Sequence, residues 1–81
     1  MNTVLLIDDE ACPIRMLGYI YDRNLLIEMI GKTKTEIASM FANARKLVFV
    51  NADGVKTDCS EMKFNGFIDG AEGGNQWIVL K

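Results

Sequence analysis

The chain has 81 residues, of which 49% are apolar, and a formal net charge of −2 from 9 basic and 11 acidic side chains. This near-neutral charge excludes the strongly basic field that follows nucleic-acid phosphates. The sequence contains no histidine, which excludes catalytic and zinc sites that require an imidazole.

The length predicts a single domain over residues 1–81. A chain of this size buries only about 60% of its unfolded surface, so we expect many large apolar side chains to stay exposed or to be covered by another chain. We therefore expect a homo-oligomer, with a dimer preferred. We expect no cofactor.

The two cysteines, Cys12 and Cys59, stand far apart in the sequence and cannot complete a zinc site by themselves. The apolar run over residues 4–7 is followed at once by acids, unlike a signal peptide. No apolar stretch approaches the ~20 residues of a membrane span. We therefore expect a cytoplasmic protein with reduced thiols and no membrane contact.

The first expected element is a buried strand over residues 4–7, after which Pro13 is expected to break the chain. Residues 14–21 and 25–30 then flank Asp-Arg-Asn, a composition that favours a β-hairpin. The alternative over residues 14–30 is a helix that begins with Pro13. Gly18 in its middle and the β-favouring residues 19–21 weigh against that helix.

A helix over about residues 34–44 is the clearest element. Thr33 and Glu36 have the spacing of a capping box, in which each side chain bonds the backbone of the other residue. Apolar residues then recur at helical spacing on one face, and these are Ile37, Met40, Phe41 and Ala44.

Strands are expected on either side of Asp53-Gly54, over residues 46–52 and 55–57. This dipeptide predicts a type I′ turn with positive φ at both residues. A further hairpin is expected from residues 62–69 and 76–80, with a glycine-rich loop over residues 70–75. The sequence thus predicts an α+β fold: an antiparallel β-sheet of hairpins with one helix packed on it.

The acidic run Asp8-Asp9-Glu10 follows the first strand directly. Residues 4–10 resemble the first strand and acidic pair of two-component receiver domains. This seven-residue resemblance implies that Asp8 and Asp9 help to hold magnesium, with Asp53 near the position of the phospho-accepting aspartate. The alternative function is therefore a small-ligand or metal-binding domain; the simpler interpretation is that acids keep a strand end soluble.

Binding residues are suggested by side-chain type. Tyr19, Tyr21 and Trp77 are candidate anchors, because Tyr and Trp bury large areas at interfaces at low entropic cost. Alternation along a strand places Tyr19 and Tyr21 on the sheet face opposite Ile14, Met16 and Ile20. Glu72 and Asn75 lie in the glycine-rich loop, and loops carry function disproportionately.

We expect a non-enzymatic binding or regulatory protein that acts through protein–protein contacts. By size and composition alone it is typical of small regulatory and inhibitory proteins, including accessory inhibitors carried by phages or mobile elements. The identity of its protein partner does not follow from the sequence.

Overall fold

The computed structural model describes residues 3–20 and 24–81. It confirms the expected α+β class and the order of strands and helix, and the paired strands are antiparallel throughout. The elements are β1 (Val4–Ile7), β2 (Glu10–Ile20), β3 (Asn24–Met29), α1 (Lys34–Ala42), β4 (Leu47–Val50), β5 (Lys56–Asp58), β6 (Phe64–Ile68) and β7 (Gln76–Leu80). Residues 14–20 and 24–29 form strands, so the helical alternative for this stretch is wrong.

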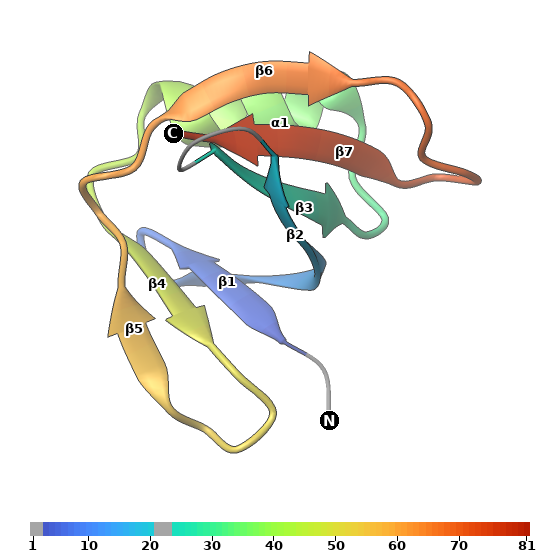
Figure 1. The fold of residues 1–81 in the computed structure, drawn as a ribbon. Coiled ribbons are helices and arrows are strands. Elements are labelled where there is room, and N and C mark those ends of the chain that lie inside the picture. Colours follow the sequence, from blue (N-terminus) through green and yellow to red (C-terminus); the bar gives the residue numbers. More distant parts are fainter. Residues whose placement is uncertain (1–2, 21–23) are drawn as a thin grey trace.

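The described strands form one curled sheet in the order β5-β4-β1-β2-β3-β7-β6. Strands β5 and β6 are neighbours in sequence but lie at opposite edges of the sheet, so the sheet must curl to let residues 59–63 join them. Figure 1 shows the result: β1, β4 and β5 form one side, and β3, β7 and β6 form the other beside α1.

Strand β2 connects the two sides of the sheet. Its residues 10–13 pair with β1, and its residues 14–20 pair with β3. The expected break at Pro13 is therefore wrong, because Pro13 lies inside β2 at the point where the strand changes partners. A proline has no N–H for a strand ladder, and here only its carbonyl is used, accepting from the Ile30 amide at 3.2 Å.

The capping box of α1 is confirmed. The Glu36 amide donates to Thr33 Oγ1 at 3.1 Å, and the Thr33 amide donates to Glu36 Oε1 at 3.2 Å. The helix ends at Ala42 with Asn43 as its C-cap, two residues before the expected end. Helix α1 buries Ile37 completely.

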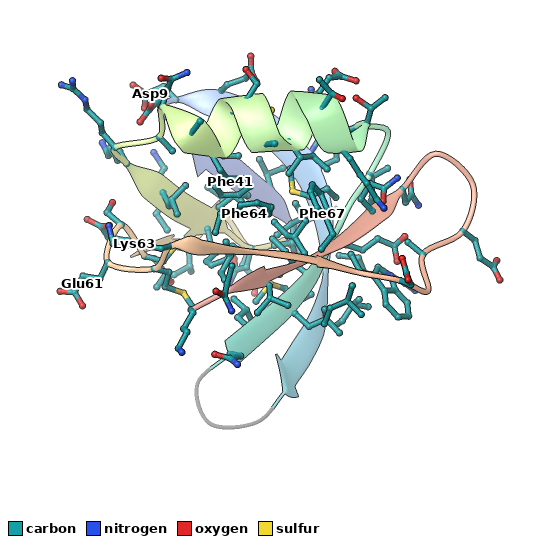
Figure 2. The ribbon with its side chains drawn as sticks, turned by 90° about the horizontal axis from the view of Figure 1, so that it is seen from above. Asp9, Phe41, Glu61, Lys63, Phe64 and Phe67 are labelled. Carbon is teal, nitrogen blue, oxygen red and sulfur yellow. The ribbon has the colours of Figure 1, made fainter. Side chains whose placement is uncertain are left out.

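One apolar core fills the space between α1 and the curled sheet. Its buried members come from both sides of the sheet: Leu5, Ile7, Cys12, Ile14, Leu25, Ile27, Met29, Ile37, Leu47, Ile78 and Leu80. Three partly buried phenylalanines extend the core between α1 and β6 (Figure 2). Phe41 stacks on Phe64 with ring centroids 5.1 Å apart, and Phe64 meets Phe67 edge-on at 5.2 Å. The expected apolar face of the helix thus packs on the sheet.

The type I′ turn lies at a different place from the one expected. Asp8 and Asp9, between the paired residues Ile7 and Glu10, both have positive φ, at 49° and 71°. At Asp53-Gly54 only the glycine has positive φ, at 82°. There the loop over residues 51–55 is organised by a side chain, because Asn51 Oδ1 accepts from the amides of residues 53 and 55.

The expected surplus of exposed apolar side chains is wrong for the part of the chain that the structure describes. The large apolar side chains exposed there are Met16 at 44% and Val55 at 57%. Both sheet edges are also poor templates for pairing: β5 has only three residues, all exposed, and β6 is irregular between Phe64 and Phe67. The arguments for a dimer are therefore weaker than the composition indicates, and the dimer stays a prediction.

The single helix of the described residues, α1, is nine residues long. It is too short to cross a membrane.

Candidate functional site

Three chemically distinct side chains face one another across the middle of the sheet. Arg15 of β2 lies opposite Glu28 of β3, which in turn lies opposite Trp77 of β7. Side chains alternate along a strand, and the neighbours Ile27 and Met29 point into the core. Glu28 and its two partners therefore project from the face of the sheet that α1 does not cover.

Glu28 is the centre of this group. Its side chain is only 9% exposed, yet it is acidic. Oε1 accepts from Arg15 Nη2 at 2.7 Å and from Trp77 Nε1 at 2.9 Å, and Oε2 accepts from Asn75 Nδ2 at 2.7 Å. These donors, the Trp77 indole foremost and then Arg15, hold the pKa of Glu28 below its usual value. A buried carboxylate is costly unless it is paired in this way, so Glu28 stays ionised and fixes the three side chains around it.

The glycine-rich loop between β6 and β7 closes onto the same group. Asn75 Oδ1 accepts from the Gly31 amide at 3.1 Å, so one side chain ties the loop both to Glu28 and to the segment that follows β3. Gly70 lies against the indole: a Cβ at this position would be 2.5 Å from Trp77 Cζ3, and its φ is 136°. The loop composition is therefore explained by close approach to Trp77 as well as by turn geometry.

A hollow of about 680 Å³ opens beside this group, and Glu72 and Ile30 contribute to its walls. Arg15 engages Glu28 through Nη2, but its side chain remains 63% exposed. A guanidinium carries five N–H donors, so Arg15 can bind an acceptor from outside while it holds Glu28. The site combines fixed donors, an exposed acid and an aromatic ring, which suits recognition of another molecule.

Three of the five residues suggested by the sequence meet here: Trp77, Glu72 and Asn75 line the hollow. Tyr21 lies outside the described residues. Tyr19 lies in β2 with its backbone opposite Leu25, and its side chain lies outside the described part of the structure. The register of β2 shifts between residues 16 and 18. The simple alternation expected along this strand is therefore wrong over residues 14–20, because a bulge changes which positions share a face.

Arg15 and Glu28 were not among the residues suggested by the sequence. Each is the lone charged residue in an apolar strand segment, which is a weak signal that becomes strong only when the cross-strand register is known.

The acidic residues implied by the receiver resemblance lie apart. Asp8 Oδ1 accepts from the amides of Arg45 and Lys46 at 2.9 and 2.8 Å, which lowers the pKa of Asp8. Asp9 lies beside it at the periphery (Figure 2). Asp53 follows the other end of β4, because Ile7 pairs with Leu47 and Val4 with Val50. Among the residues that the structure describes, no cluster of three acids or cysteines could hold a metal ion.

No protein-family model matches this chain, and neither the curated proteins nor the solved structures include a significant match.

Proposed function

We propose that the protein is a non-enzymatic binding module and that it contacts a protein partner through the Glu28 site, defined as Arg15, Glu28, Glu72, Asn75 and Trp77. The observation that carries the proposal is the buried Glu28 carboxylate, which fixes Arg15, Asn75 and Trp77 beside an open hollow. Side chains held in place before binding lose little entropy when a partner arrives.

The residue types at this site support a protein partner. Trp and Arg are the side chains most often found to dominate binding energy at protein interfaces. Arg15 can donate to a backbone carbonyl or a carboxylate of the partner, while Glu72 favours a basic or N–H-bearing group nearby. We propose a regulatory or inhibitory role in the cytoplasm, where the free thiols of Cys12 and Cys59 would persist.

The proposal is tested with two exposed positions of the site. Arg15→Ala and Glu72→Arg each change the surface without removing a core residue, and Lys56→Ala on the exposed strand β5 is the control. We expect a partner captured from the source cells to bind the wild type and Lys56→Ala with equal Kd, and to bind the two site variants about tenfold or more weakly. Thermal denaturation first establishes that all four proteins fold. Equal Kd values for all four proteins would refute the proposal.

Self-association is a separate proposal, which we retain from the sequence. Light scattering at micromolar concentration tests it directly, because a dimer has twice the 9.1 kDa mass of the chain. A single species at the monomer mass would end this proposal and leave the hetero-partner unaffected.

A further inference from the structure

A second cavity, independent of the Glu28 site, opens between the strands on the core side of the sheet. It has a volume of about 350 Å³, and its walls come from β2, β3, β4, β5 and the segment that joins β5 to β6, with Thr3 before β1 and Asn51 after β4. No residue of α1 lines it. The cavity is therefore an opening into the curled sheet that the helix does not cover.

The described residues that line this cavity are all uncharged. Met16, Leu25, Phe49 and Met62 provide its apolar surface, and the Cys59 side chain and three neutral polar residues complete it. The hollow at the Glu28 site, in contrast, is lined by an arginine and two glutamates. Removing an ion from water costs several kcal/mol unless an opposite charge compensates it. No residue in the described lining of the cavity offers an ionic ligand such compensation, and a neutral ligand needs none.

The volume of the cavity and the flexibility of its methionine side chains further restrict the class of ligand that it can bind. Small-molecule sites usually occupy about 300–1,000 Å³ and are mostly apolar with a few polar groups, so this cavity belongs at the lower end. Leu25 forms a buried wall at 3% exposure, whereas Met16 stands at the opening with 44% of its surface exposed. Methionine side chains are flexible and polarisable and adapt to flat apolar rings. An aromatic molecule of one or two rings matches these properties.

We propose that this cavity binds a neutral, mainly apolar small molecule with one or two aromatic rings. The Thr57 hydroxyl and the Asn51 amide nitrogen at its wall can bond a single polar group on such a ligand, while Asn51 Oδ1 accepts from the amides of residues 53 and 55. Binding covers Met16, which is otherwise one of the two most exposed large apolar side chains among the described residues. This site does not depend on the protein partner proposed above.

Indole is a suitable probe, and the methionine methyl groups report where it binds. In an NMR titration of protein carrying ¹³C-labelled methionine methyl groups, we expect saturable shifts of Met16 and Met62. Met40 in α1, which does not line the cavity, should stay unchanged. Indole-2-carboxylate, an anion of similar shape, should bind about tenfold or more weakly, because no described residue of the cavity wall compensates its charge.

Substitutions at the opening complete the test. Met16→Lys should weaken indole binding about tenfold, since it brings a charge to an apolar wall, whereas Met16→Leu should keep it. Val55→Lys is the matched control, because Val55 is the other exposed large apolar side chain among the described residues and lies outside the cavity. Shifts that do not saturate, equal binding of the carboxylate, or unchanged binding by Met16→Lys would each overturn the proposal.

Discussion

Replacing Asp9 by glycine should stabilise the protein, although glycine usually weakens structure. Asp9 has φ 71° and is the second residue of the turn between β1 and β2. Its side chain is exposed and accepts no hydrogen bond from the described residues. The substitution therefore removes backbone strain without removing a contact.

The size of the effect is the difference between two backbone terms. Left-handed geometry costs about 1–2 kcal/mol for most L-residues, with aspartate near the lower end. Glycine offsets about 0.5–1 kcal/mol of this gain, because it gives the unfolded chain a greater conformational entropy. Relief of repulsion from the adjacent Asp8 and Glu10 adds a small gain. We expect a net stabilisation of about 0.5 kcal/mol, which raises Tm by about 2–4 °C in a domain of this size.

Circular dichroism melting at pH 7 measures this change, and two variants control it. Asp53→Gly makes the same change in charge and side chain at a residue without positive φ, so it should not raise Tm. Asp8→Gly should lower Tm, because the Asp8 carboxylate accepts from two backbone amides. If Asp9→Gly melts at or below the wild type, or if Asp53→Gly gains as much, the strain argument is wrong. Repeating the melts with millimolar magnesium tests the receiver resemblance, which requires that magnesium stabilise the wild type but not Asp9→Gly.

Three further substitutions test the packing and the site. Glu28→Gln should cost about 1.5–3 kcal/mol at pH 7, the usual value of hydrogen bonds to a charged group. Because the pKa of Glu28 is lowered, its contribution is present above the unfolded pKa of about 4.3 and is lost as pH falls through the lower folded value. Urea unfolding should therefore show a smaller difference between the two proteins at pH 2–3 than at pH 7, and a constant difference would contradict this. Phe41→Ala should cost about 2–3 kcal/mol, less than a fully buried phenyl group, since Phe41 is half-buried against Phe64; an unchanged Tm would show that this stack adds nothing. Gly70→Ala should lower Tm and shift the fluorescence of Trp77, because the new Cβ would meet the indole; unchanged emission would show that the loop does not rest on the ring.

Local signals in the sequence predict the order of the elements, but not the continuation of β2 through Pro13 or all of the turns. The Thr33–Glu36 box predicts the start of α1 correctly because both of its hydrogen bonds join residues three apart. The Asp-Gly pair at residues 53–54 predicts the wrong turn because Asn51 Oδ1 organises that loop instead. Asp8 and Asp9 form the type I′ turn instead. In the sequence, a run of adjacent acids indicates an ion site more strongly than it indicates a turn.

The candidate site could be predicted only in part. Trp77 and Asn75 are suggested by residue type and by their place at a glycine-rich loop. Glu28 is recognisable as central only when β2, β3 and β7 are aligned, since its donors lie 13, 47 and 49 residues away in the sequence. The composition also leads to the wrong expectation that many large apolar side chains are exposed. The curled sheet and α1 share a core that buries most of the described ones.

The position of β7 between β3 and β6 has a consequence for how the chain reaches this fold. Strands β1, β2 and β3 are joined by short connections and can pair locally, but β7 joins β3 through residues 47 to 55 positions apart in the sequence, from Met29–Gln76 to Leu25–Leu80. Closing such a long segment costs entropy before any contact is gained, and folds with many non-local pairings form in about milliseconds to seconds. Until β7 docks, the N-terminal strands expose the apolar surface that Ile78 and Leu80 later cover. Refolding is therefore most productive in dilute protein, where the unprotected strands meet their own β7 before they meet another chain.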